Sequence, residues 1–156
     1  MSFASNAIPV DQIIVSEYCR SWKTANLAFG EWTQKDSRLN FLPYEDYTRD
    51  HIALMKKNVM PLLTYPPLPG TNTIIIGHDD PFEAVTGIYP EPQGIAYILQ
   101  PDGGKSFKII DSVLPSEWAT LWARQPLWSL IIWLERCSGS NTRLMRCQHS
   151  RHRRAG

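Results

Sequence analysis

The stretch TIIIGHDDP, residues 73–81, decides the fold class because it joins a buried strand to the start of a helix. The continuous apolar run of residues 73–76 is typical of a strand that is covered on both faces of a parallel sheet. Asp80 is placed to be the N-cap of a short helix, with Pro81 at its first position. We therefore expect a strand, a turn at residues 77–80, and a helix over residues 82–86 that Gly87 ends.

A second strand-to-helix unit lies earlier in the chain. Residues 13–15 form a β-branched run that Ser16 ends, and apolar residues then recur at helical spacing over residues 18–29, before Gly30. A further amphipathic helix is predicted over about residues 48–63, with Pro61 breaking its last turn. The proline-rich residues 65–70 then form a stiff connector.

The later part of the chain predicts a hairpin and a helix. Residues 95–99 and 107–113 read as strands joined by the turn PDGG, residues 101–104. Ser116 is expected to cap a helix from about Glu117 that Pro126 interrupts. Four tryptophans, Trp118, Trp122, Trp128 and Trp133, are expected to pack this helical region against the sheet. Together these elements predict an α/β domain whose sheet is thin, as if a central strand were absent.

Composition sets the domain organisation. The 156 residues are 43% hydrophobic, enough for one globular domain, which we place at residues 1–135. Glu135 is the last acidic residue, and six arginines follow it, so residues 136–156 form a basic tail. Such a tail could bind nucleic acid or an anionic surface, but a disordered, solvated tail is the simpler interpretation, and we expect no nucleic-acid partner.

The sequence contains no motif for a membrane span, a signal peptide, a metal site or a nucleotide-binding loop. The longest apolar run, LWSLIIWL at residues 127–134, is too short to span a bilayer. The N-terminal residues lack the pattern of a signal peptide, so the chain as it stands is expected to be cytoplasmic. The three cysteines form no CxxC pair and no Cys/His metal spacing, and we see no nucleotide-binding glycine loop. We therefore expect neither a metal nor a cofactor.

Two segments carry chemistry, each at the carboxyl end of a predicted strand, where ligands bind in open α/β sheets. Arg20 lies in the first turn of a predicted helix and could hold a phosphate together with the helix N-terminus. His78 could donate to a phosphoryl oxygen, and the adjacent Asp79 could protonate a leaving alkoxide. Taken singly, Arg20 could also be an ordinary surface residue, His78 a turn residue, and Asp80 only a helix cap.

Taken together, the two segments resemble the histidine phosphatase superfamily, also called phosphoglycerate-mutase-like. Residues 16–20, SEYCR, running on to TANLAFG at residues 24–30, are similar to the pocket-arginine segment of a bacterial branch. An apolar strand precedes His78, as it precedes the second histidine of that family. TGIYPEP at residues 86–92 and LQPDG at residues 99–103 are similar to the same branch, and the resemblance covers roughly residues 8–118.

The resemblance implies a three-layer α/β/α sheet and the hydrolysis of phosphomonoesters through a phosphohistidine. Arg20 would be the family's second arginine and His78 its second histidine, both stabilising charge on the phosphoryl group. Asp79 would be the candidate proton donor. The ligand would be phosphate or a phosphomonoester.

The sequence departs from the family at the nucleophile. The family's first strand ends in Arg-His-Gly or Arg-His-Ala, but the fifteen residues before Ser16 contain no histidine. His51 lies in a predicted helix, and the RHR of residues 151–153 lies in the basic tail without a preceding strand. The resemblance thus predicts an incomplete sheet that lacks its first central strand, and a chain without covalent phosphoryl transfer.

Three functional interpretations stay open. The first is a truncated histidine-phosphatase homologue with little or no activity, whose open sheet edge could pair with a second copy. The second is a fragment of a longer, active periplasmic phosphatase whose start is misplaced. The third is a non-catalytic module that binds phosphate or a phosphorylated ligand.

Overall fold

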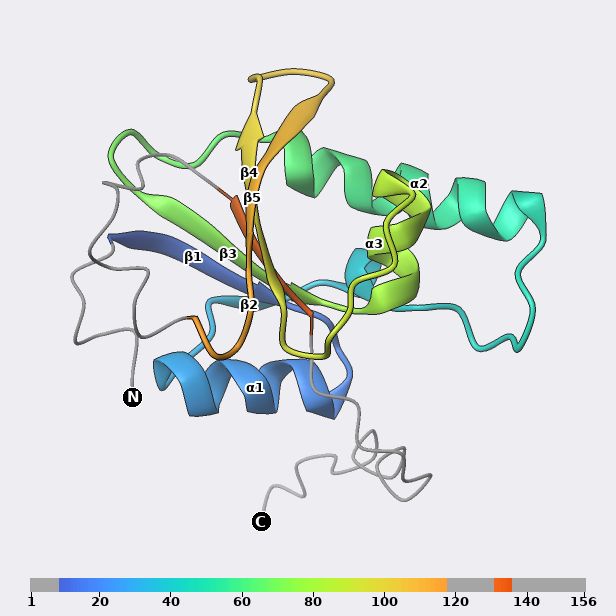
Figure 1. The fold of residues 1–156 in the computed structure, drawn as a ribbon, viewed down its shortest axis with the longest axis horizontal. Helices are drawn as coiled ribbons and strands as arrows, with labels where there is room; N and C mark the ends of the chain where they lie inside the picture. The colour runs from blue at the N-terminus through green and yellow to red at the C-terminus, as the bar shows by residue number, and fades with distance from the viewer. Residues whose placement is uncertain (1–8, 118–130, 136–156) are drawn as a thin grey trace, which may run out of the picture.

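The computed structural model describes residues 9–117 and 131–135, which form an α/β fold around one six-stranded mixed sheet (Figure 1). The strand order is β2-β1-β3-β6-β4-β5. The elements are β1 (Val10–Val15), α1 (Cys19–Phe29), β2 (Gln34–Lys35), a 3₁₀ turn (Ser37–Leu39), α2 (Arg49–Thr64), β3 (Asn72–Gly77), α3 (Asp79–Thr86), β4 (Ala96–Pro101), β5 (Phe107–Val113) and β6 (Ile131–Glu135).

Strand β6 occupies the centre of the sheet, drawn orange-red in Figure 1. It runs parallel to β3, with Trp133 opposite Ile75, and antiparallel to β4, with Trp133 opposite Tyr97. The expectation of a sheet that lacks a central strand is therefore wrong for this chain, because its own later residues supply one. In the described parts of the chain, β3 and β4 are paired on both sides, and the outer strands of the sheet are β2 and β5.

The position of Trp133 also corrects a prediction. We expected it in a helical region, but it lies in β6, where Ile131, Ile132 and Trp133 are fully buried. A short apolar run fits a strand that is covered on both faces as well as it fits a helix. The helix predicted from about Glu117, with Trp118, Trp122 and Trp128, falls on residues 118–130, outside the described residues, as does the tail after Glu135. Residues 115–117 form a turn.

The helices cover both faces of the sheet. Helix α1 packs through Ala25 on one face, which is built from alternate strand residues such as Ile74, Ile76 and Ile132. Helices α2 and α3 cover the other face, where Ile75 and Trp133 contact apolar residues of both helices; these are Val59, Leu62, Leu63 and Phe82. Burying an aliphatic or aromatic side chain of this size stabilises the fold by about 1.5–3 kcal/mol. No helix among the described residues is long and apolar enough to cross a membrane.

Two helix predictions are confirmed in their main part. Helix α1 ends at Gly30, which takes the left-handed conformation with φ of 84°. Helix α2 begins at a capping box in which the Thr48 side chain and the His51 side chain each accept a bond from the other's backbone N–H. Pro61, however, does not break α2, which continues to Thr64. The buried contacts of Leu62 and Leu63 with the core outweigh the roughly 3 kcal/mol that a helical proline costs.

The start of α3 differs from the prediction by two residues. His78, in extended conformation, is the N-cap, and Asp79 and Asp80 both lie in the first turn. Asp80 is therefore not the cap. Negative side chains in the first turn of a helix are stabilised by the helix dipole. The aspartates therefore did indicate the start of a helix, but the helix begins two residues earlier than predicted. Gly87 ends the helix as expected.

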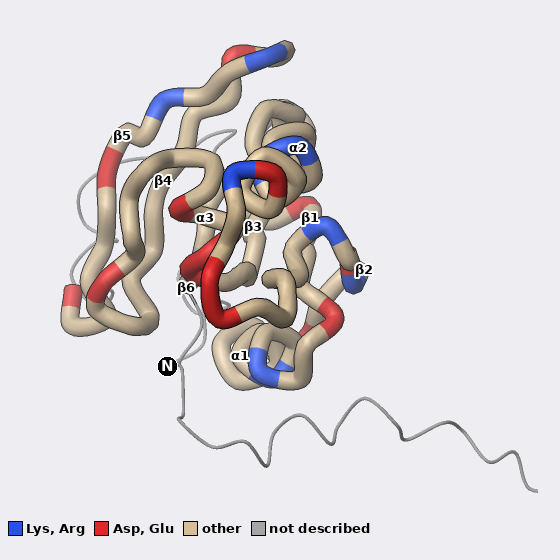
Figure 2. The backbone as a smooth tube through the Cα atoms, turned by 90° about the vertical axis from the view of Figure 1, so that its right-hand side faces the viewer, with Lys and Arg blue, Asp and Glu red and all other residues tan. Residues whose placement is uncertain are grey.

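The predicted hairpin is confirmed. Strands β4 and β5 pair antiparallel, with a register shift between Ile98 and Leu99. Asp102 organises the turn by accepting from the backbone N–H groups of Gly104 and Ser106. In the view of Figure 2, basic and acidic positions are interspersed over the helices and strands rather than gathered by sign.

Candidate functional site at the carboxyl edge of the sheet

The carboxyl ends of β1 and β3 bring Ser16 and His78 together, although they are 62 residues apart in sequence. The two strands are parallel, with Val15 opposite Ile76, and the Ser16 backbone N–H donates to the Ile76 carbonyl. The Ser16 Oγ lies 2.7 Å from His78 Nε2, and both side chains are fully buried. The pairing of two strands therefore fixes the position of the candidate histidine.

A chain of hydroxyl groups continues from this contact. Ser16 Oγ lies 2.7 Å from Ser21 Oγ, which is also buried, in the first turn of α1. If Ser16 donates its proton to Ser21, its oxygen is left to accept from His78 Nε2–H. The chain thus keeps Nε2 inside the protein and orients the imidazole. Sequence reasoning missed both serines, because the contact depends on the pairing of distant strands.

An aromatic pair brings Arg20 and His78 to one place. Tyr18 and Phe41 stack with ring centroids 4.6 Å apart, and His78 lies edge-on to them at 5.3 and 5.1 Å respectively. The Arg20 guanidinium carbon lies 4.8 Å from the centroid of Phe41 and 5.9 Å from that of Tyr18. A guanidinium over an aromatic face is attracted by the ring quadrupole. The two residues chosen from the sequence therefore share one aromatic neighbour pair.

Phe41 contacts His78 and Arg20 from a loop, and its local sequence gives no sign of this role. It belongs to residues 31–46, a polar stretch that contains only β2 and a 3₁₀ turn besides irregular chain. Nothing in the local pattern distinguishes Phe41 from other loop residues. Its role comes from the fold, which lays this loop against the start of α1, where Asn40 also contacts Glu17.

The two aspartates of α3 are held by tyrosines. Asp79 is half-buried; its Oδ2 accepts from the Tyr89 hydroxyl at 3.2 Å and its Oδ1 from the Asp80 backbone N–H. Asp80 Oδ2 accepts from the Tyr47 hydroxyl at 3.0 Å. Burial raises the pKa of Tyr47 above its usual range, and the hydrogen bond to Asp80 and the charges of both aspartates raise it further. Both carboxylates therefore accept a hydrogen bond from a tyrosine hydroxyl, and both are half-buried.

The other histidines do not join His78 in the described structure. His51 lies at the start of α2, where it takes part in the capping box and stacks on Tyr44 with centroids 4.3 Å apart. His149 and His152 lie outside the described residues. Within the described ranges, no group of three or more His, Cys, Asp or Glu residues could hold a metal ion.

Strand β6 reaches the same edge. Its last residue, Glu135, is opposite Gly77, which directly precedes His78. The indole of Trp133 lies over Gly77 so closely that a Cβ atom there would be 2.2 Å from the ring. Trp133 also packs on Phe82 of α3, with centroids 5.2 Å apart. Glycine at position 77 therefore lets the central tryptophan support the backbone that carries His78.

Comparisons with known proteins give no match for this chain among protein-family models, curated proteins or solved structures.

Proposed function

We propose that the edge formed by Arg20, His78 and Asp79 binds the phosphoryl group of phosphate or a phosphomonoester. In this proposal the chain is related to the histidine phosphatases, shares their three-layer arrangement, and hydrolyses little or nothing. The observation that carries it is the meeting of Arg20 and His78 across the Tyr18–Phe41 pair. The cationic Arg20 and the buried His78 come from segments that are far apart in sequence and lie around one pair of rings.

The backbone favours an anion at the same edge. Helix α1 begins at Cys19 and helix α3 at Asp79, each directly after a parallel strand. The N-terminus of a helix carries partial positive charge and unpaired N–H groups, which stabilise a phosphate. Arg20 adds a planar fork of donors suited to phosphate oxygens. The Asp79 carboxylate opposes the charge of a phosphate dianion, so we infer that it weakens the binding that Arg20 and the helix N-termini provide.

The inference of weak or absent hydrolysis rests on the nucleophile. Phosphoryl transfer through a phosphohistidine, the route that the resemblance implies, needs a free imidazole beside the phosphorus atom. His78 Nε2 is engaged with Ser16, and His51 caps α2. Of the two strands that adjoin β3, β1 is followed by Ser16 and β6 ends in Glu135, so neither places a histidine there. Losing one member of a catalytic unit lowers the rate by orders of magnitude, which supports a binding role rather than turnover.

The test is calorimetric titration of the full chain with inorganic phosphate, alongside an assay with p-nitrophenyl phosphate. Arg20→Ala should abolish binding. Arg49→Ala is the matched control, since Arg49 also lies in the first turn of a helix. It should leave phosphate binding unchanged, because that helix is α2 rather than α1. Equal binding by both variants would refute the site. If the wild-type chain hydrolyses p-nitrophenyl phosphate and His78→Ala abolishes that activity, the claim that the chain does not hydrolyse phosphomonoesters is refuted. The chain would then be a phosphatase.

A further inference from the structure

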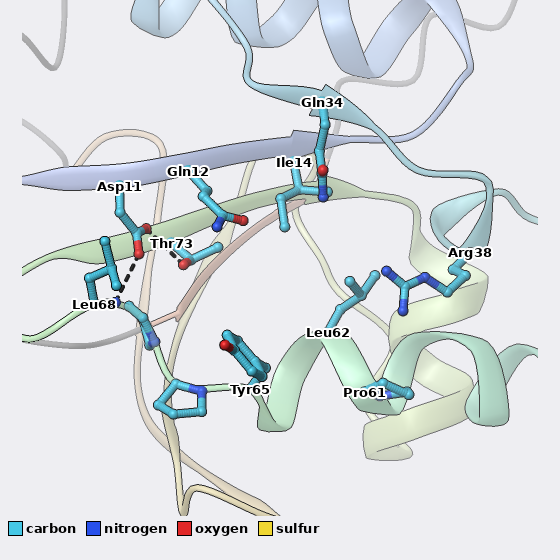
Figure 3. Close-up of a pocket in the computed structure, with 12 residues that line it drawn as sticks. Asp11, Gln12, Ile14, Gln34, Arg38, Pro61, Leu62, Tyr65, Leu68 and Thr73 are labelled. Carbon is cyan, nitrogen blue, oxygen red and sulfur yellow. Dashed lines mark hydrogen bonds between the residues drawn. The ribbon is translucent and has the colours of Figure 1, made fainter.

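A second site lies away from the phosphate edge, in a cavity of about 410 Å³ between β1 and the C-terminal end of α2 (Figure 3). Its sheet side includes Asp11 and Gln12 of β1 and Gln34 of β2, and its helix side includes Leu62 and Tyr65. It shares no lining residue with the edge formed by Arg20, His78 and Asp79. A cavity of this volume lies in the range that accepts a small organic molecule.

The hydrogen-bonding groups that face this cavity are mostly neutral. In Figure 3 the side chains of Gln12 and Gln34 extend from the strands toward the side where Tyr65 lies. Within the described ranges, neither side-chain amide nor the Tyr65 hydroxyl makes a hydrogen bond. An amide can donate and accept at once, as can a phenol. These three groups therefore offer both kinds of bond to a ligand.

The charged groups around the cavity are already bonded within the protein. The Asp11 carboxylate accepts from the Thr73 hydroxyl and the Leu68 backbone N–H, both at 2.9 Å, and so ties the proline-rich connector to the sheet. Arg38 is paired with Asp36, which lowers the pKa of the Asp36 carboxyl through their side-chain hydrogen bond. The charged side chains that line the cavity therefore already have partners within the protein, and the neutral amides and the phenol are the hydrogen-bonding groups left for a ligand.

The remaining wall is apolar and exposed. The Tyr65 side chain is 75% exposed and that of Leu68 is 64% exposed. Prolines of the connector hold the backbone between them stiffly, so this surface is formed before any ligand arrives. An aromatic ring beside aliphatic carbons suits the C–H face of a ring-shaped, hydroxylated molecule.

We propose that this cavity binds an uncharged saccharide. The amides of Gln12 and Gln34 would exchange hydrogen bonds with its hydroxyl groups, and Tyr65 would lie against a C–H face of the sugar ring. The amides and the phenol suit neutral hydroxyl groups, whereas Arg20 suits an anion, so this site and the phosphate edge select different ligands. The proposal does not depend on the function proposed for that edge.

Saturation-transfer NMR with the full chain tests the proposal, using methyl α-glucopyranoside, methyl β-galactopyranoside and N-acetylglucosamine as probes. At least one sugar should receive saturation, most strongly at ring C–H protons. Gln12→Leu and Gln34→Leu should each raise Kd by about fivefold to tenfold, the loss of one hydrogen bond. Tyr65→Ala should abolish the signal. Gln100→Leu, an exposed glutamine of β4 outside the cavity, should leave it unchanged.

Three results would overturn the proposal. One is the absence of transfer to all three sugars. Another is unchanged binding in the Gln12→Leu/Gln34→Leu double variant, with far-ultraviolet circular dichroism showing that the variant is folded. The third is binding of an uncharged tetra-alanine peptide in preference to the sugars, lost in the same variants, which would make the cavity a peptide groove. Excess inorganic phosphate should not displace the sugar.

Discussion

The imidazole of His78 and the hydroxyl of Ser16 form a buried contact of 2.7 Å between the ends of two neighbouring parallel strands. A polar group in such a place must keep its partner, because water cannot replace it. The contact therefore acts on the fold as well as on the candidate site. The contribution of the Ser16–His78 contact to stability can be measured by removing one serine hydroxyl group at a time.

Ser16→Ala should lower the free energy of unfolding by about 1–3 kcal/mol, the effect of leaving a buried polar group unpaired. Urea denaturation followed by tryptophan fluorescence measures it. Ser37→Ala, at an exposed position at the start of the 3₁₀ turn, is the matched control and should change stability by less than about 0.5 kcal/mol. Equal effects of the two substitutions would mean that the Ser16–His78 contact contributes nothing to stability.

Gly77→Ala should be destabilising, because the new Cβ would be 2.2 Å from the buried Trp133 ring. Overpacking of this kind typically costs about 1–3 kcal/mol. Gly104→Ala is the control, since a Cβ there would meet nothing within 4 Å. Thermal and urea unfolding of both variants give the comparison.

The same substitution should be less harmful when the indole is smaller. In a double-mutant cycle with Trp133→Leu, the effect of Gly77→Ala should shrink, which gives a coupling energy between the two positions. Strictly additive effects would show that Gly77 is required for another reason than its contact with Trp133.

Asp36→Asn should reduce stability at neutral pH, because the Asp36 carboxylate accepts from Arg38 through both its backbone N–H and its guanidinium. These bonds hold the pKa of Asp36 below its usual range. A lowered pKa stabilises the folded state above the unfolded pKa near 4, and that contribution disappears as pH falls through the folded value. The stability difference between wild type and Asp36→Asn should therefore shrink with acidification.

Unfolding free energies measured at several values between about pH 2 and pH 7 give this difference as a function of pH. Arg38→Gln separates the cap from the ion pair, since it removes the guanidinium and keeps the carboxylate. It should cost less than about 1 kcal/mol, as exposed ion pairs do. A difference between wild type and Asp36→Asn that stays constant down to the acidic limit would contradict the assignment.

Ionisation of the Tyr47 phenol should lower the free energy of unfolding at alkaline pH. Its pKa is raised chiefly by burial and then by the hydrogen bond to Asp80, so the folded state retains the phenolic proton longer than the unfolded state does. Stability is then intact below the unfolded pKa near 10 and falls as pH rises above it. Tyr47→Phe should flatten this decline, measured by urea unfolding from neutral to strongly alkaline pH. Tyr65→Phe, at an exposed tyrosine, should leave the slope as in wild type.

Asp79→Asn should tighten the binding of inorganic phosphate at neutral pH if the carboxyl group adjoins the bound phosphoryl group. Removing one negative charge at about 4–6 Å from a dianion relieves on the order of 1 kcal/mol or more, roughly tenfold in Kd. Calorimetric titration measures the change, and Asp111→Asn on β5 serves as the distant control. Weaker binding in Asp79→Asn would place this side chain among the donors that hold the ligand instead.

Local patterns predicted the elements that depend on neighbours in sequence. Strand β3 and the end of α1 at Gly30 follow from an unbroken apolar run and from a residue that adopts positive φ without strain. Capping rules placed α3 with an error of two residues, since Asp79, Asp80 and Pro81 all suit a first turn. The resemblance implied that Arg20 and His78 lie at one phosphoryl group, and the parallel pairing of β1 with β3 brings the two segments that carry them to one edge of the sheet.

Long-range contacts account for what the sequence did not predict. The central place of β6 depends on partners in β3 and β4, and neither strand carries a signal for a partner so far along the chain. The same holds for Ser16, Ser21 and Phe41, whose contacts around His78 exist only once the strands and the loop before α2 are assembled. Competition between helix and strand at residues 131–133 is resolved by burial on both faces of the sheet.

The central position of β6 has a consequence for the order of folding. In the described structure β6 is the strand that joins the β2-β1-β3 half of the sheet to the β4-β5 hairpin. Strand β3 ends at Gly77 and β5 at Val113, so both halves of the sheet are synthesised before residues 131–135. Contacts between residues so distant in sequence form slowly. The inner edges of β3 and β4 therefore lack their central partner until residues 131–135 are made, and unpaired strand edges of this kind favour aggregation of the nascent chain.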